Sequence, residues 1–179
     1  MEIDGLIQDE PEDEASAVLT ALFQQHQAAL CAYLSCLVND WETGRELTQE
    51  TFLRALRARR QLLEVENRRA WLYRIATNLA IDARRRARRW QWLPWHKLDA
   101  ADDFTTGRAE RRLAVAEALA ALPVKYRVPL LLYSGYGFSA GEVAEVLNLG
   151  YEAVKTRLYR ARKMFRYAYG EEDDDSPST

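Results

Sequence analysis

Residues 138–160, FSAGEVAEVLNLGYEAVKTRLYR, contain two short helical patterns separated by a turn. Ser139 and Glu142 have the spacing of a capping box, so a helix is expected to begin there. The turn at Asn148-Leu149-Gly150 ends it. The next helix buries one stripe of apolar side chains at helical spacing: Val154, Leu158, Ala161 and Phe165. This arrangement predicts a helix-turn-helix, whose second helix enters the major groove of DNA.

The open face of that second helix is polar and mainly basic. Its candidate DNA-binding residues are Glu152, Lys155, Thr156, Arg157, Tyr159, Arg160, Arg162 and Lys163. Lys155 and Arg160 can donate to guanine edges, and Thr156 can contact a base through its hydroxyl or methyl group. Arg157, Arg162 and Lys163 suit phosphates. The alternative interpretation is a helical hairpin whose basic rim is only solvated.

A second basic helix is expected from Arg68 to about Arg89, after a break at Glu66-Asn67. Its apolar stripe leaves a polar stripe at steps of four and three, made of Arg74, Asn78, Asp82, Arg85 and Arg89. Such a stripe can both bind base edges and grip phosphates. A solvated charged helix is the alternative, in which Asp82 pairs with Arg85 or Arg86.

Charge is strongly segregated along the 179 residues, although the net charge is only −2. Residues 1–40 carry −8 and the tail 170–179 carries −5, whereas residues 54–97 carry +10 and residues 151–169 carry +5. Two separate basic blocks in an otherwise acidic chain indicate a polyanion ligand that is bound at two places.

The predicted fold class is all-α, with two small helical domains joined by a flexible linker. The segments are an acidic disordered N-terminus (1–15), a helical domain (16–90), a linker (91–110), a second helical domain (111–169) and an acidic tail (170–179). Asp40 to Gly44 is expected to interrupt the first domain. Pro129 is expected to kink a helix over residues 124–134, because proline removes a backbone donor.

Several classes of protein are disfavoured by composition. The chain has no long apolar run and no signal-peptide pattern, so we expect a cytoplasmic protein. Cys31 and Cys36 are the only cysteines, which is too few for a disulfide framework. With His26 and His96 the only histidines and no phosphate loop or metal motif, we expect no enzyme, catalytic residue, cofactor, metal or small-molecule substrate.

Three segments together resemble the extracytoplasmic-function (ECF) sigma factors of bacteria. They are QETFLRA (49–55), AWLYRIATNLAID (70–82) and VKTRLYRAR (154–162), and the resemblance covers roughly residues 17–168. The resemblance implies a sigma region 2-like domain over 16–90 and a region 4-like domain over 111–169. It also implies binding to core RNA polymerase and direction of that enzyme to promoters.

The resemblance further implies a role for each candidate site. The core polymerase clamp would contact Glu46, Gln49, Glu50 and Phe52, although Arg45 stands where the family usually carries an acid. The minus-ten element would contact a base-capturing loop and the helix after it, through Glu64, Asn67, Arg68, Arg74, Asn78, Asp82, Arg85, Arg86 and Arg89. The helix-turn-helix would read the minus-thirty-five element. An anti-sigma factor is an implied partner that could hold the protein near the membrane.

A helix-turn-helix transcription regulator that does not bind core polymerase is the main alternative, with the first domain used for dimerisation. The stripe of Arg74, Asn78, Asp82 and Arg85 argues against it, because a dimer interface should be apolar there. Pull-down of core polymerase would separate the two hypotheses.

Overall fold

Two sets of helices make up the computed structural model, which describes residues 10–89 and 107–170, with side chains placed over 14–87 and 110–170. The first set contains α1 (Glu10–Val38), α2 (Trp41–Arg57), α3 (Arg59–Glu64) and α4 (Arg68–Arg89). The second contains α5 (Gly107–Ala121), α6 (Val124–Leu130), the π-helical turn η1 (Leu131–Gly135), α7 (Ala140–Leu147) and α8 (Tyr151–Tyr169). No strand occurs in these ranges, so the all-α prediction is confirmed.

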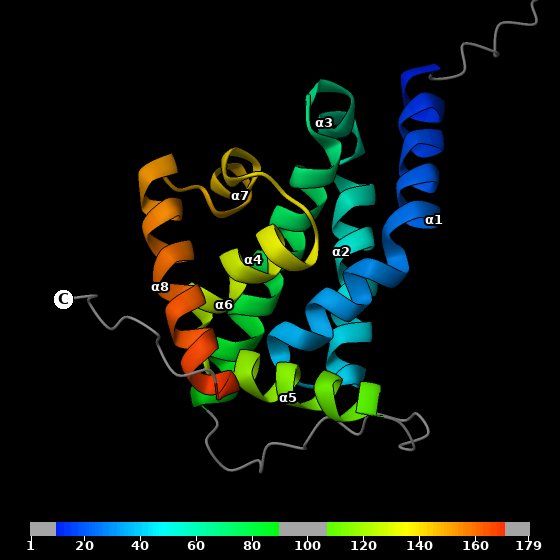
Figure 1. The fold of residues 1–179 in the computed structure, drawn as a ribbon. Coiled ribbons are helices and arrows are strands. Elements are labelled where there is room, and N and C mark those ends of the chain that lie inside the picture. Colours follow the sequence, from blue (N-terminus) through cyan, green and yellow to red (C-terminus); the bar gives the residue numbers. More distant parts are fainter. Residues whose placement is uncertain (1–9, 90–106, 171–179) are drawn as a thin grey trace, which may run out of the picture.

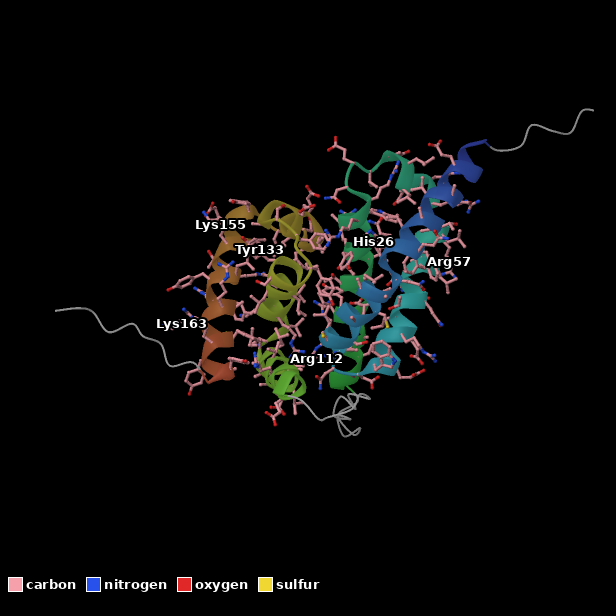
Figure 2. The ribbon with its side chains drawn as sticks, turned by 45° about the vertical axis from the view of Figure 1, so that its right-hand side comes forward. His26, Arg57, Arg112, Tyr133, Lys155 and Lys163 are labelled. Carbon is pink, nitrogen blue, oxygen red and sulfur yellow. The ribbon has the colours of Figure 1, made fainter. Side chains whose placement is uncertain are left out.

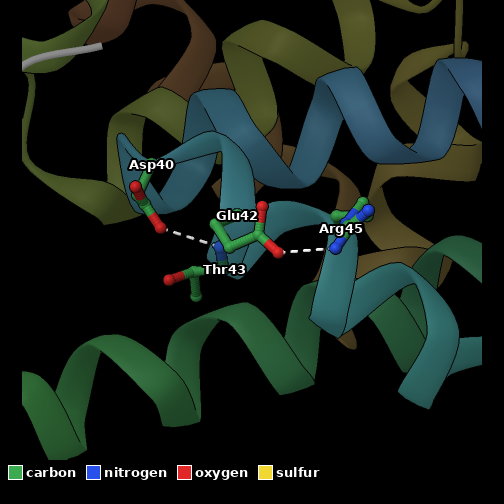
Figure 3. Close-up of polar contacts among 4 residues, drawn as sticks. All are labelled: Asp40, Glu42, Thr43 and Arg45. Atoms are coloured by element: carbon green, nitrogen blue, oxygen red, sulfur yellow. Dashed lines mark hydrogen bonds and ion pairs between the residues drawn. The ribbon is translucent and has the colours of Figure 1, made fainter. Parts of the chain in front are cut away.

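The turn between α1 and α2 is shorter than expected. Only Asn39 and Asp40 interrupt the helices, and Asn39 takes the left-handed conformation with φ 62°. The Asp40 carboxylate accepts a hydrogen bond from the backbone N–H of Thr43 at 2.7 Å and thereby caps α2 (Figure 3). The prediction of an interruption from Asp40 to Gly44 is therefore wrong, because Gly44 lies inside α2 and is buried against α1.

Two helices begin earlier than the sequence pattern indicates. The structure begins α1 at Glu10 rather than Ser16, so residues 10–15 of the acidic segment are helical rather than disordered. Acidic residues and proline are both tolerated in the first turn of a helix, which explains the difference. Likewise α5 begins at Gly107, so residues 107–110 of the predicted linker are helical. The remainder of that linker, with Trp90, Trp92 and Trp95, lies outside the described residues.

Pro129 lies inside α6 and changes the helix that follows it. The α-helical pattern ends at Leu130, and the chain continues as the wider turn η1. A proline lacks the N–H that an α-helix uses, so the hydrogen-bond register changes near it. The expected single helix over 124–134 is therefore divided into α6 and η1.

The helix-turn-helix has the local geometry that its sequence predicts. Ser139 and Glu142 form both hydrogen bonds of the capping box at the beginning of α7. Asn148 ends α7 in the left-handed conformation with φ 50°, and α8 begins after Gly150. Asparagine adopts this conformation more easily than other residues with a side chain, which explains the tight turn.

The two sets of helices pack against each other through one continuous apolar core. Leu72 and Tyr73 of α4 belong to the same cluster as Phe138, Val143 and Leu158 of the helix-turn-helix. In Figure 1, α1 and α8 lie on opposite sides, with α4 and α6 between them. The two predicted helical domains are thus in direct contact in this structure.

A buried arginine joins the two sets of helices at a polar point. Arg127 of α6 is 2% exposed and donates hydrogen bonds to the carbonyl oxygens of Leu37 (3.3 Å) and Leu122 (3.1 Å), and also to that of Ala120. Arg84 of α4 donates to the same Leu37 oxygen at 2.7 Å. The carbonyl end of α1 is therefore held by cations from both helical sets.

Within the described residues, no helix has both the length and the apolar character required to cross a membrane. Cys31 and Cys36 are both half-buried and are not joined in a disulfide.

Candidate nucleic-acid interface

Helix α8 presents the face that is predicted to read DNA. Val154, Leu158 and Ala161 are buried, which fixes the rotation of the helix about its axis. The exposed side chains are Glu152, Lys155, Thr156, Tyr159, Arg160, Arg162 and Lys163, and Arg157 is half-buried. Figure 2 shows Lys155 and Lys163 along the outer side of α8. All eight candidate residues are thus accessible on one helix.

The interactions within this face are weak and local. The Lys155 Nζ lies 3.3 Å from Glu152 Oε1, and the Thr156 hydroxyl donates to the Glu152 carbonyl at 2.9 Å. The Arg162 guanidinium lies 5.1 Å from the centre of the Tyr133 ring. Exposed ion pairs of this kind contribute about 0–1 kcal/mol, so DNA can replace them at little cost.

The polar stripe on α4 is exposed as predicted. Arg74, Asn78, Asp82 and Arg85 all face solvent, and Arg86 is exposed beside them. Arg85 Nη1 lies 3.8 Å from Asp82 Oδ1, which is the local pairing that the sequence allows. The side chain of Arg89 lies outside the described side chains.

The loop before α4 is not open to a ligand in this structure. The Asn67 side chain caps α4 by accepting from the Ala70 N–H, and its Nδ2 donates to Glu142 Oε1 of α7 at 2.9 Å. Next to it, Arg69 donates to the Tyr136 carbonyl oxygen and lies 4.0 Å from the centre of the Phe138 ring. Glu64 and Arg68 remain accessible at the edge of this loop. The candidate minus-ten loop is therefore held against the helix-turn-helix.

The Glu142 carboxylate should make this contact dependent on pH. Hydrogen bonds from the Ser139 backbone, and then from Asn67, hold the pKa of Glu142 below its usual 4.5. The carboxylate therefore stabilises the fold above its unfolded pKa, and this contribution disappears as pH falls through the lower folded pKa. We expect Glu142→Gln to reduce the fall in urea midpoint between pH 6 and pH 3. Glu145→Gln, an exposed change on the same helix, is the control, and equal pH profiles for both variants would contradict this role of Glu142.

The candidate clamp-binding residues on α2 divide into two groups. Glu46 is exposed, Gln49 is accessible on the same side, and Glu50 pairs with Arg54 at 2.8 Å. Phe52 is only 9% exposed and makes an edge-on contact with Phe23 at a centroid distance of 4.9 Å. The selection of Phe52 as a surface contact is therefore wrong, because its ring belongs to the core.

Arg45, which departs from the family pattern, has a local partner. Its Nη2 lies 2.6 Å from Glu42 Oε1 on the exposed side of α2 (Figure 3). The unusual positive charge is thus partly balanced by an acid one turn earlier.

Among the described residues, no group of three or more histidine, cysteine or acidic side chains is placed so that it could hold a metal ion. Burial and the nearby Arg69 lower the pKa of His26, whose ring meets that of Tyr73 edge-on. His26 is accordingly a packed, preferentially neutral side chain.

Sequence reasoning did not identify two polar residues of α6 that lie beside the predicted DNA-binding face of α8. Lys125 and Tyr126 line a hollow together with Thr156, Arg157 and Arg160 of α8. Their position depends on how α6 packs against α8, which no local pattern reveals. The sequence alone shows only that Lys125 follows Pro123 and therefore lies near the beginning of a helix that precedes the helix-turn-helix.

These features define an all-α DNA-binding protein with a helix-turn-helix and a second basic helix. Residues 22–90 match the family model for sigma-70 region 2, and residues 112–165 match that for sigma-70 region 4.

Relatives of known function cover most of the chain. The ECF RNA polymerase sigma factor SigL of Mycobacterium tuberculosis is 30% identical over 156 residues, which span 84% of this chain and 88% of SigL. The RNA polymerase sigma factor SigZ of Bacillus subtilis is 30% identical over 143 residues, covering 79% of this chain and 81% of SigZ. The chain therefore belongs to the ECF family of RNA polymerase sigma factors.

Two solved structures have a similar fold. The sigma factor RpoE of Bartonella quintana, in complex with the anti-sigma factor NepR, gives a TM-score of 0.71 at 21% identity and covers 83% of this chain and 94% of RpoE. CnrH, in complex with the cytosolic domain of CnrY, gives a TM-score of 0.64 at 26% identity and covers 93% and 97% of the two chains.

Proposed function

We propose that this sigma factor reads the minus-thirty-five element with the exposed face of α8 and opens the minus-ten element with α4 and the loop before it. The observation that carries the proposal is the pair of exposed polar faces on separate helices. Lys155, Thr156 and Arg160 lie on one, and Arg74 and Asn78 lie on the other. The ammonium, guanidinium, amide and hydroxyl groups of these side chains are the groups that proteins use to read base edges and to bind phosphates.

Opening of the minus-ten element requires the two helical sets to separate locally. While Asn67 donates to Glu142 and accepts from the Ala70 N–H, its side chain is oriented toward α7 and the backbone of α4, so it cannot turn freely toward a flipped base. The stripe of Arg74, Asn78 and Arg85 needs no such release, because it already faces solvent. The proposed order is therefore docking through exposed faces, followed by release of the Glu64 to Asn67 loop from α7. Extraction of a base costs a few kcal/mol, which contacts with the released loop must offset.

Core polymerase is proposed to bind the exposed side of α2. Glu46 and Gln49 are the accessible candidates. Glu50 can contribute if its ion pair with Arg54 is replaced by an ion pair with a cation of the polymerase. The region 2-like unit is assigned to residues 16–90 and the region 4-like unit to residues 111–169, with residues 10–15 and 107–110 added as the beginnings of their first helices.

An anti-sigma factor is a further proposed partner. RpoE was solved with a protein called an anti-sigma factor, and CnrH was solved with the cytosolic domain of CnrY. The proposed site of action is the cytoplasm, where core polymerase works, and such a partner could hold the protein near the membrane. The protein is proposed to act by binding, without a chemical reaction of its own.

Promoter selection with the assembled enzyme tests the function directly. The full-length chain is incubated with core polymerase and a promoter library, and the transcripts are sequenced. Lys155→Ala or Arg160→Ala should relax base preference at the upstream element by about 1–3 kcal/mol for each bidentate pair of hydrogen bonds that the change removes. Binding to core polymerase should be unchanged in both variants.

A matched control comes from a different helix of the same domain. Arg112→Ala removes an exposed cation of α5, which Figure 2 shows apart from Lys155 and Lys163 of α8, and it should leave base preference unaltered. Unchanged upstream preference in the Lys155 and Arg160 variants would show that α8 is not the reading helix. A chain that did not bind core polymerase would instead behave as the regulator considered above.

A further inference from the structure

A hollow lies between α6 and α8, beside the face proposed to read DNA. Lys125 and Tyr126 line it from α6, and Thr156, Arg157 and Arg160 line it from α8. Its volume is about 410 Å³. Because none of these side chains is fully buried, the charged ends of Lys125, Arg157 and Arg160 can reach a ligand in the hollow. The site thus combines two helices that are separated in sequence by η1 and α7.

The charge of the hollow is suited to an anion. Three cations line it, and the one acid at its edge, Glu152, is paired with Lys155 at 3.3 Å. The net charge around the hollow is therefore positive even with Glu152 present. Cations that are clustered and accessible are the usual ligands of phosphate in DNA recognition.

Tyr126 connects the cations of α6 with those of α8. Lys125 Nζ lies 4.9 Å from the centre of the Tyr126 ring, within the range of a cation–π contact. A hydrogen bond from Arg160, and more weakly the charge of Lys125, lowers the pKa of the Tyr126 hydroxyl. Tyr126 and Arg160 also line the same hollow, so Arg160 lies beside a residue that belongs to a different helix.

A held arginine is better prepared for base recognition than a free one. The guanidinium has five N–H donors in a fixed plane, so one bond to Tyr126 leaves the other donors for a base edge. A side chain that is already positioned loses less rotamer freedom on binding. Tyr126 would thus favour the orientation of Arg160 without contacting a base itself.

The position of the hollow favours DNA as the source of the anion. In helix-turn-helix proteins, side chains near the beginning of the second helix contact base edges, and neighbouring groups contact the flanking phosphates. Thr156 and Arg160 belong both to the reading face and to the wall of the hollow. A phosphate next to the bases that they read would therefore lie within reach of Lys125.

We propose that Lys125 and Arg157 bind one backbone phosphate of the upstream promoter DNA in this hollow, and that Tyr126 is a positioning residue for Arg160. The inference rests on the proposed assignment of α8 as the minus-thirty-five reading helix. It adds two residues of α6 to the DNA interface.

The phosphate site is tested with full-length protein, core polymerase and promoter DNA at a series of salt concentrations. Lys125→Ala should weaken binding to all upstream sequences alike and make the log–log salt slope shallower by about 0.9. The exposed Arg112→Ala variant is the control and should keep the slope. DNA with a neutral methylphosphonate at single backbone positions identifies the phosphate, because one such position should abolish the difference between Lys125→Ala and the parent protein.

The positioning role of Tyr126 is tested with Tyr126→Phe, which keeps the ring and removes the hydroxyl. Base preference should relax severalfold only at the position that Arg160 reads, and Tyr126→Phe should have no further effect in an Arg160→Ala background. Equal weakening on all sequences would refute the positioning role.

The outcomes separate this proposal from the function on which it rests. If Lys155→Ala and Arg160→Ala change base preference while Lys125→Ala leaves the salt slope and the methylphosphonate pattern unaltered, only the phosphate site is wrong. If none of these variants alters upstream binding, the assignment of α8 itself is wrong. If Lys125→Ala weakened binding to an acidic protein partner and left DNA binding intact, the phosphate site would also be overturned.

Discussion

Gly44→Ala should destabilise the fold by about 2–3 kcal/mol, even though alanine is the better helix former by about 1 kcal/mol. A Cβ at residue 44 would lie 2.7 Å from both the backbone N and the Cα of Ser35 in α1. Backbone atoms cannot move aside as the end of a flexible side chain can. The two helices would therefore have to separate along their shared, buried face.

Gly141→Ala provides an internal comparison of opposite sign. A Cβ there would meet only the Ser139 Oγ, at 3.9 Å, which is an ordinary contact. Because Gly141 lies in α7 and is exposed, alanine should stabilise the protein by about 0.5–1 kcal/mol. Urea unfolding of the two variants measures both effects, and two changes of the same sign would contradict the steric explanation for Gly44.

Ser35→Ala tests which atoms of α1 cause the conflict. The Ser35 hydroxyl is buried without a hydrogen-bond partner, so its removal alone should cost little or even stabilise the protein. It should not rescue Gly44→Ala, because the backbone of residue 35 would still clash. Full rescue would show that the hydroxyl, and not the backbone, sets the helix spacing.

Local patterns predict the parts of this fold that depend on neighbours in sequence. The bounds of α4, the buried stripe of α8 and the capping box of α7 agree with the structure, because apolar periodicity and capping spacing act within a few residues. The same local reasoning wrongly places Gly44 in a turn. Its close approach to Ser35 depends on the packing of two helices, which a single helical pattern does not contain.

The candidate site is predictable to a similar extent. Exposure of Asn78 and Arg160 follows from the apolar stripes on the opposite sides of their helices. Burial of Phe52 against Phe23, and the bond between Asn67 and Glu142, require knowledge of which helices meet. The role of Arg127 cannot be predicted from its charge, because the sequence pattern does not distinguish a buried arginine from a solvated one.

Arg127→Ala should produce a still larger loss of stability, about 3–5 kcal/mol, which is at the upper end for a single substitution. Burial first, and then the charge of Arg84, lowers the pKa of Arg127 to about 10, so the guanidinium remains positive at neutral pH. Hydrogen bonds from a charged donor contribute about 1.5–3 kcal/mol each. Alanine would leave the carbonyl oxygens of Leu37, Ala120 and Leu122 without this donor and would add a cavity.

Conservative variants separate the charge of Arg127 from its shape and its volume. Arg127→Lys keeps the charge but cannot reach oxygens at the ends of α1 and α5 together, so it should restore less than half of the stability. Arg127→Met fills space without a donor and should also remain destabilised. The urea midpoint of each full-length variant is compared with that of the exposed Arg112→Ala. Parent-like stability in Arg127→Met would show that packing, rather than the hydrogen bonds linking the two helical sets, is what the arginine provides.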